Sequence, residues 1–221
     1  MATIAELKTK FRDGYSSGDI LSVDPDELRA RRERTSGCDY LEIFHKAIAP
    51  HIAGKSQVLE IGPGRGSWTK SMLSFNPECT VHALDFLDLT QFFPEDLYDG
   101  RLKLVRIQGN TFKEVPNDHF DFFWSFGVLC HCEMPHVQRI LERSLMKVKP
   151  GCSAIHQHGE WGKTDRYEKG LAAGKPWIKW WPRNTTANMV KMAKAAGWEV
   201  VEPDMGLIDR DGLIHLRRPI E

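Results

Sequence analysis

Short apolar runs alternate with helical patterns from residue 57 onward, and this alternation limits the possible folds more than any other feature of the sequence. The runs lie at residues 58–61, 80–84, 102–107, 120–126 and 152–157. Strands that alternate with helices pair in parallel, so we expect a parallel sheet with helices on both faces. An amphipathic pattern from Val137 to Val148 predicts one of these helices, and Pro150-Gly151 is expected to stop it just before the fifth strand.

Two more strands are expected after these five runs. A helical pattern over residues 185–196 ends at Gly197, a typical C-terminal stop, and strands are expected near 198–201 and 206–216. We therefore expect an α/β fold in which a doubly wound, mostly parallel seven-stranded sheet forms a domain over residues 56–221.

The first 55 residues are expected to form a helical arm that precedes the sheet. Asp24-Pro25-Asp26-Glu27 is typical of a helix start, and apolar residues at 40, 43, 44, 47 and 48 follow helical spacing. This apolar stripe must pack somewhere, so we expect residues 1–55 to act as a lid on the domain that follows.

Length and charge exclude several classes of protein. With 221 residues, the chain has room for one such domain and an appendage, but not for two full domains. Thirty Lys+Arg balance thirty Asp+Glu, so no uniform positive field exists to hold nucleic acid or an anionic membrane, and neither partner is expected.

Targeting signals and cysteines favour a cytoplasmic location. Charged residues interrupt positions 1–13, which is unlike a signal peptide, and the most apolar window, 120–130, is about half of the ~20 residues that a membrane helix needs. Five scattered cysteines argue against a disulfide framework and fit a reducing compartment.

Three glycines directly follow the first strand, in the run Val58-Leu59-Glu60-Ile61-Gly62-Pro63-Gly64-Arg65-Gly66-Ser67-Trp68. A side chain at these positions would block a tight turn and the close approach of a ligand to the backbone. Asp85 closes the second strand, where a carboxylate can accept hydrogen bonds from both hydroxyls of a ribose. The pattern therefore predicts a nucleotide-type site, although Asp85 could also be a helix cap.

The spacing of the glycines distinguishes between nucleotide cofactors. The loop is G-x-G-x-G, whereas the dinucleotide fingerprint is G-x-G-x-x-G, and the position of its third glycine is occupied here by Ser67. With Glu60 as the acid before the glycines, the segment resembles motif I of class I S-adenosylmethionine-dependent methyltransferases. The resemblance spans roughly residues 57–158.

This resemblance implies that S-adenosylmethionine is the cofactor and S-adenosylhomocysteine the product. The cofactor residues that it implies are Glu60, Gly62, Gly64, Gly66, Asp85, Phe86, Gly109, Asn110 and Ser125. The family often has Asp at the adenine-contacting position, where this chain has Asn110, whose amide oxygen can still accept from an exocyclic amine. Phe86 and Leu87 would form an apolar wall for adenine or belong to the core.

Three histidines follow or end strands four and five, where a parallel sheet presents its carboxyl ends. His131 and His158 are rival candidates for a catalytic base, and strand alternation puts His156, a candidate acceptor contact, on the same face as His158. Each could instead be a hydrogen-bonded histidine of the cleft wall. No metal is expected, because the sequence has no second ligand pair to complete a zinc site with His131-Cys132-Glu133 and His136.

A tryptophan-rich insert is expected over residues 159–183, after the fifth strand. The candidate acceptor contacts in it are Trp161, Trp177 and Trp180, since indole rings can cover flat ligands. Alternatively, these side chains pack the insert against the edge of the sheet. Arg166 and neighbouring cations could bind an acidic group of the acceptor or simply be solvated.

The expected activity is methyl transfer to a small molecule, at oxygen rather than nitrogen because of the cleft histidines. One alternative is a nicotinamide-dependent oxidoreductase, against which stand the glycine spacing and the lack of a Tyr-x-x-x-Lys pair. Another is a non-catalytic, cofactor-binding partner subunit.

Overall fold

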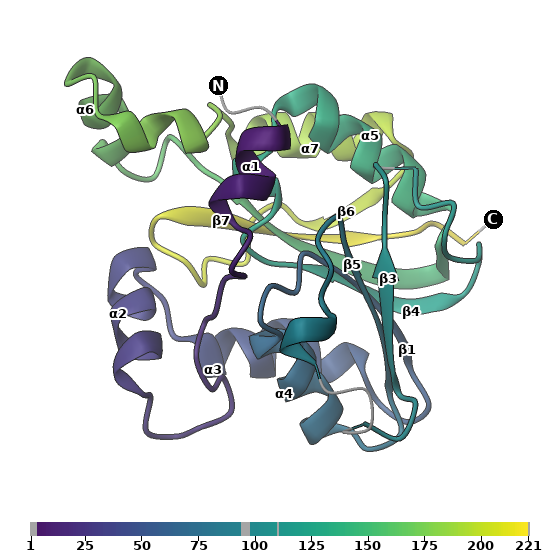
Figure 1. The fold of residues 1–221 in the computed structure, drawn as a ribbon. Helices are drawn as coiled ribbons and strands as arrows, with labels where there is room; N and C mark the ends of the chain where they lie inside the picture. The colour runs from purple at the N-terminus through teal and green to yellow at the C-terminus, as the bar shows by residue number, and fades with distance from the viewer. Residues whose placement is uncertain (1–3, 94–97, 110, 221) are drawn as a thin grey trace.

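The computed structural model describes residues 4–93, 98–109 and 111–220, which form one seven-stranded sheet with helices around it (Figure 1). The strand order is β3-β2-β1-β4-β5-β7-β6. The strands are β1 (Gln57–Ile61), β2 (Thr80–Asp85), β3 (Leu102–Arg106), β4 (Phe120–Ser125), β5 (Val148–Gly159), β6 (Glu199–Glu202) and β7 (Asp211–Arg217). β1 to β5 pair in parallel, while β7 runs antiparallel between β5 and β6. The predicted α/β fold with a mostly parallel seven-stranded sheet is confirmed.

Helices cover both faces of this sheet (Figure 1). They are α1 (Ile4–Lys10), α2 (Glu27–Ser36), α3 (Tyr40–Ile43), α4 (Ser67–Phe75), α5 (Met134–Leu145), α6 (Arg166–Ala172) and α7 (Thr186–Ala195), with short 3-10 or π turns η1 (Phe44–Ile48), η2 (Ala49–His51), η3 (Thr90–Phe92), η5 (Leu129–His131) and η6 (Pro176–Trp180). Alternate residues of β1 enter separate apolar clusters: Val58 joins the cluster of α3 and α4, and Leu59 joins that of α5 and α7. No helix in the described part of the chain combines the length and the apolar character that a membrane span requires.

One expected element boundary is wrong. Pro150-Gly151 does not stop α5 ahead of the fifth strand, because α5 ends at Leu145 and β5 already begins at Val148. Proline removes a ladder donor, and the pairing with β4 accordingly shifts register here. Gly151 has φ +79°, and its N–H donates to the carbonyl oxygen of Arg218 at 2.8 Å. The pair therefore makes an irregularity inside the strand.

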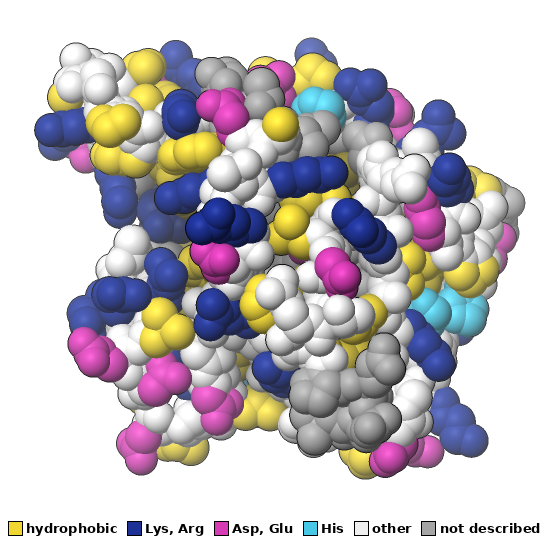
Figure 2. All heavy atoms as spheres, viewed as in Figure 1, with side chains coloured by type: hydrophobic (Ala, Val, Ile, Leu, Met, Phe, Trp, Pro, Cys, Tyr) yellow, Lys and Arg dark blue, Asp and Glu magenta, His cyan; other side chains and the backbone are white. Residues whose placement is uncertain are grey.

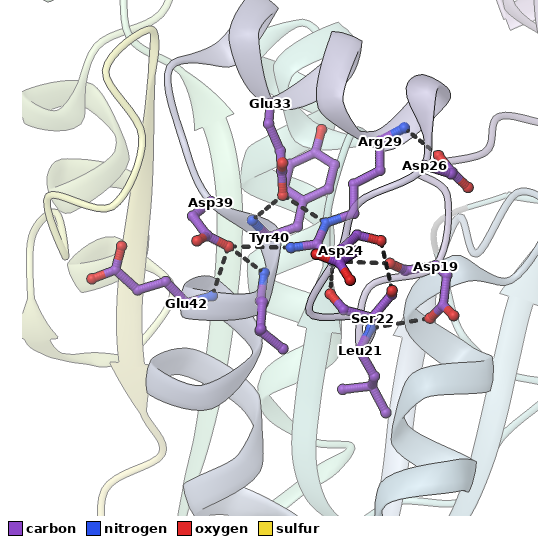
Figure 3. A network of polar contacts seen from close by, with 11 residues as sticks. Asp19, Leu21, Ser22, Asp24, Asp26, Arg29, Glu33, Asp39, Tyr40 and Glu42 are labelled. Carbon is purple, nitrogen blue, oxygen red and sulfur yellow. Dashed lines mark hydrogen bonds and ion pairs between the residues drawn. The ribbon is translucent and has the colours of Figure 1, made fainter.

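A buried arginine ties the turns of the N-terminal arm together (Figure 3). Arg29 of α2 is 2% exposed, and its Nε donates to Glu33 Oε1 at 2.7 Å. Its Nη1 donates to the carbonyl oxygen of Asp19 at 3.1 Å, and its Nη2 to Asp39 Oδ1 at 3.3 Å. Asp39 also caps α3 by accepting from two backbone N–H groups. The guanidinium thus fixes the path of the chain between α1 and α3.

The arm shares the core of the sheet domain. Tyr40 and Ile43 of α3 are almost fully buried in the same apolar cluster as Trp68 and Met72 of α4. Tyr40 lies against Trp68, with ring centroids 5.4 Å apart. Because burial of such side chains is the main stabilising contribution to folding, α3 is anchored in this core, whereas the described side chains of α1 are mostly exposed.

Candidate active site

A cavity of about 530 Å³ opens at the carboxyl ends of the parallel strands. Ile61 ends β1, Asp85 ends β2, Phe126 follows β4 and Gln157 lies near the end of β5, and all four line the cavity. This is where open α/β sheets bind ligands, because the strand order reverses between β1 and β4 and the loops diverge there.

The glycine loop forms one wall of the cavity, through Gly62 and Gly64. Both have positive φ, +66° and +59°, which favours glycine. A Cβ on Gly64 would collide with the carbonyl oxygen of Tyr15, and the N–H of Arg65 donates to that oxygen at 2.8 Å. The loop therefore needs glycine partly because the arm passes directly over it, a contact that the sequence did not predict.

Gly66 and Glu60 support the loop and are not among the described residues that line the cavity. Gly66 precedes α4 with φ +80°, and a Cβ there would collide with the ring of Phe93. Glu60 is 2% exposed, and its Oε2 accepts from Thr69 Oγ1 of α4 at 2.5 Å. Burial raises the pKa of Glu60 to about 8, with the Thr69 hydrogen bond opposing that shift.

Asp85 and Phe86 face the cavity together at the end of β2. Asp85 Oδ1 accepts from the N–H of Leu87 at 2.9 Å, which orients the carboxylate. Burial raises the pKa of Asp85, and hydrogen bonds from the backbone of Leu87 and Phe86 oppose this. Leu87 lines the cavity as well, and the Lys8 ammonium lies 5.5 Å from the centroid of the Phe86 ring.

The other three residues that the resemblance implied for the cofactor differ in placement. Asn110 lies outside the described residues. Gly109 is exposed and does not line the cavity. Ser125 is fully buried, does not line it either, and its hydroxyl lies 2.9 Å from His156 Nδ1.

His131 is the one predicted histidine that lines the cavity in the described part of the chain. Its Nδ1 lies 2.6 Å from the carbonyl oxygen of Trp180, which can only accept, so Nδ1 carries the proton. The neutral ring then keeps its lone pair on Nε2, as a general base requires. Burial lowers the pKa of His131, opposed by the bond to Trp180, so this neutral form is favoured near pH 7.

His156 and His158 belong to β5, and neither is among the residues that line the cavity. Both are fully buried and follow the parity of Ala154, which belongs to the cluster under α5 and α7. The His158 ring packs against Gly212, where any Cβ would collide with it. Burial lowers the pKa of both histidines, to about 3 for His156. Their shared face, predicted from alternation, is thus the face opposite to the glycine loop's helix α4.

Two of the three candidate tryptophans, Trp177 and Trp180, line the cavity, and so does Trp181, which was not a candidate. Trp177 and Trp180 belong to η6. Trp161 does not line the cavity: it is 7% exposed, and its ring stacks on that of Tyr167 with centroids 5.3 Å apart. Trp181 contacts the His131 ring, with centroids 4.6 Å apart.

Helix α1 closes the cavity beside this insert. Lys10 and Phe11 line it, and the Phe11 ring lies 5.2 Å from that of His131. Lys10 Nζ lies 5.6 Å from the Trp180 ring centroid, and Lys179 of the insert pairs with Glu6 of α1 at 3.3 Å.

Sequence reasoning missed the basic residues that reach the cavity from distant parts of the chain. Arg32 comes from α2 and Arg210 from the turn before β7. Arg32 lies 4.3 Å from the Tyr15 ring centroid, and its buried Nε has no partner in the described structure. No local motif marks either arginine, because the tertiary fold alone brings them here.

The residues present fit the cofactor implied by the sequence. The glycine loop leaves backbone exposed on the cavity, Asp85 supplies a carboxylate for ribose hydroxyls, and the orphaned Nε of Arg32 can bind a carboxylate. Over residues 4–93, 98–109 and 111–220, no three His, Cys, Asp or Glu side chains gather as metal ligands would.

Comparison with known proteins relates this chain to one protein family. A family model described as a methyltransferase domain matches residues 29–202. A search of curated protein sequences finds no significant match.

Several solved structures share the fold. The mitomycin 7-O-methyltransferase MmcR is 17% identical with a TM-score of 0.59, over 74% of this chain and 49% of MmcR. The O-methyltransferase NcsB1 from neocarzinostatin biosynthesis, solved with S-adenosylmethionine and 2-hydroxy-5-methyl naphthoic acid, is 15% identical with a TM-score of 0.60, over 87% of this chain and 58% of NcsB1. An S-adenosylmethionine-dependent methyltransferase from Aquifex aeolicus is 13% identical with a TM-score of 0.63, over 88% of this chain and 100% of that chain. This chain thus matches about half the length of MmcR but the whole of the A. aeolicus protein.

Proposed function

We propose that this chain, which belongs to the methyltransferase-domain family and is a class I S-adenosylmethionine-dependent methyltransferase, methylates an oxygen atom of a small molecule. The observation that carries the choice of oxygen is the hydrogen bond between His131 Nδ1 and the Trp180 carbonyl oxygen. This bond leaves Nε2 of a cavity-lining imidazole able to accept the proton of an acceptor hydroxyl.

The cofactor is held by residues of the glycine loop and β2 in this proposal. Gly62 and Gly64 offer backbone contacts, Asp85 accepts from the ribose hydroxyls, and Phe86 lies against adenine. Arg32 binds the carboxylate of the methionine part, since its buried Nε is otherwise without a partner in the described residues. When bound, S-adenosylmethionine supplies a methyl group already activated by its sulfonium.

His131 acts as the base in the transfer. Nε2 of His131 would accept the proton of the acceptor hydroxyl, and S-adenosylmethionine, held by the glycine loop and Asp85, would supply the methyl group to that oxygen and leave as S-adenosylhomocysteine. The insert tryptophans and Phe11 exclude water from this end of the cavity, which favours alignment of acceptor and methyl group. His158 has no role in this scheme, since it is not one of the described residues that line the cavity.

The experiment is an S-adenosylhomocysteine-release assay against a panel of phenols, alcohols and matching amines, with product methylation sites read by mass spectrometry. We expect methylation at oxygen. In His131→Ala we expect kcat to fall about 10²-fold to 10⁴-fold while cofactor affinity is retained. His158→Ala serves as the comparison and should keep more of its kcat once its folding is verified. Methylation of amines alone, or a His131→Ala enzyme as fast as the parent over the whole pH range, contradicts the proposal.

A further inference from the structure

Positive charge predominates around the cavity. Among the described residues that line it, Lys10, Arg32, Arg166 and Arg210 are cationic and Asp85 alone is acidic, while the buried Asp211 behind the lining balances the charge of Arg210. Figure 2 shows dark blue Lys and Arg side chains gathered around the hollow between α2 and α6. The cofactor adds a sulfonium and an ammonium against one carboxylate, so it brings further positive charge. A neutral or cationic acceptor would leave this excess unbalanced.

Two of these cations lie on the insert tryptophans and have no carboxylate partner in the part of the chain that the structure describes. Arg166 lies 5.3 Å from the Trp177 ring centroid, and Lys10 lies 5.6 Å from that of Trp180. Arg32, by contrast, lies over the ring of Tyr15, whose carbonyl oxygen accepts from the glycine-loop N–H of Arg65, and it is assigned here to the cofactor. The unbalanced charge is therefore greatest at the tryptophan wall.

Arg210 is held rigidly at the same wall by a buried carboxylate. Its side chain is 13% exposed, and its Nε and Nη2 donate to Asp211 Oδ2 at 3.0 and 2.6 Å. Asp211 is fully buried, and its carboxylate accepts two further hydrogen bonds, from Tyr167 Oη at Oδ1 and from Gln157 Nε2 at Oδ2. In the part of the chain that the structure describes, Nη1 of Arg210 makes no hydrogen bond, which keeps that edge available to a ligand.

One indole ring joins this arginine to the candidate base. The Arg210 guanidinium lies 4.6 Å from the Trp181 ring centroid, and the His131 ring lies 4.6 Å from the same indole. A planar ligand with an anionic group and a hydroxyl can thus reach both side chains from one position against the tryptophans. Guanidinium groups bind carboxylates in a fork geometry that suits such recognition.

We propose that the methyl acceptor is an aromatic hydroxy acid whose carboxylate binds Arg210. Its ring lies against the insert tryptophans and its hydroxyl faces His131. The inference rests on the proposed oxygen methylation and adds the charge and shape class of the acceptor.

The test measures binding rather than turnover, so that it can fail separately from the proposed function. The protein is loaded with S-adenosylhomocysteine and titrated, by ligand-observed NMR, with 2-, 3- and 4-hydroxybenzoate and the three matching hydroxybenzamides. These pairs differ in charge but hardly in shape. At least one benzoate should bind about 10-fold to 100-fold more tightly than its amide, the usual effect of a hydrogen bond to a charged group. Raising the ionic strength should reduce that ratio.

The variant that removes the anion site is Arg210→Met combined with Asp211→Asn, because Arg210→Met alone would leave a buried carboxylate uncompensated. The double variant should bring the benzoate-to-amide ratio close to one while S-adenosylhomocysteine affinity stays near that of the parent. Arg183→Met is the matched control, since Arg183 belongs to the insert but is exposed, pairs with Glu168 and does not line the cavity. It should keep the parental ratio.

Two results would overturn the inference. One is equal binding of benzoates and amides by the parent at low salt, which needs no variant. The other is a double variant that is folded, binds S-adenosylhomocysteine and keeps the parental ratio. Failure of the parent to bind S-adenosylhomocysteine, or methylation of amines alone, would instead count against the proposed function.

Discussion

At the scale of single residues, the three histidines show what strand alternation can and cannot predict. Period-2 alternation correctly groups His156 with His158, but it does not tell which face of the sheet they occupy. Both faces are covered by helices, so a histidine at a strand end is as compatible with the core as with the cavity. His131 differs because it lies on η5, beyond the end of β4, where the chain has left the sheet.

Asp85→Ala should weaken S-adenosylmethionine binding about 10-fold to 100-fold, because ribose hydroxyls lose a carboxylate partner in a buried position. Calorimetry measures this affinity directly. Asp88→Ala is the control, since Asp88 is exposed on the same turn and does not line the cavity. Equal affinities for the parent and Asp85→Ala, with Asp88→Ala also unchanged, would remove Asp85 from the site.

At the scale of elements, regular patterns predicted the strands well and the connections poorly. The run at 120–126 became β4, and the pattern at 185–196 became α7, because hydrophobic period depends on local sequence. The position of α1 against the insert depends instead on contacts such as Lys179 with Glu6, 173 residues apart, for which no local signal exists.

Helix α1 should become protected from hydrogen exchange when S-adenosylhomocysteine binds. Its residues Lys10 and neighbouring Phe11 line the cavity, while the helix itself is only seven residues long and mostly exposed, so its own stability is low. Exchange mass spectrometry of α1, with α7 as an internal reference remote from the lining, measures the effect. Identical exchange of α1 with and without ligand would contradict a lid.

At the scale of the whole molecule, the alternation of strands and helices predicted the sheet, while the strand order required the structure. Parallel crossovers connect β1 to β5, but β7 lies between β5 and β6 and runs antiparallel to both. Because β7 is antiparallel, it begins at the edge of the sheet where the parallel strands end, and Arg210, which precedes β7, therefore reaches the cavity. An arginine whose place depends on the final strand order cannot be assigned from local sequence.

Buried ionisable groups on opposite faces should give opposite contributions to the pH dependence of stability. Burial lowers the pKa of His156 to about 3, so between about pH 5 and 6 the unfolded chain binds a proton that the folded chain does not. Burial raises the pKa of Glu60 to about 8, so in the same pH range the folded chain binds a proton that the unfolded chain does not. His156 therefore makes stability rise with pH, and Glu60 makes it fall.

Urea unfolding at several pH values from 5 to 6 separates the two effects. His156→Gln should lower the slope of unfolding free energy against pH by up to about 1.4 kcal/mol per pH unit, and Glu60→Gln should raise it by a similar amount. The comparison of slopes removes contributions that both variants share with the parent. Two variants with the parental slope would show that neither group keeps its neutral form in the folded protein.

The hydrogen bond from His131 to the Trp180 carbonyl oxygen has a consequence for how the enzyme can change. The backbone that sets the proton position of the candidate base belongs to the same turn, η6, that presents tryptophans to the acceptor. Remodelling η6 for a new acceptor would therefore also disturb the tautomer on which the proposed base catalysis by His131 depends. Laboratory evolution of substrate range should advance through side-chain exchanges that keep the path of this backbone, with insertions and deletions in the turn being lost at selection.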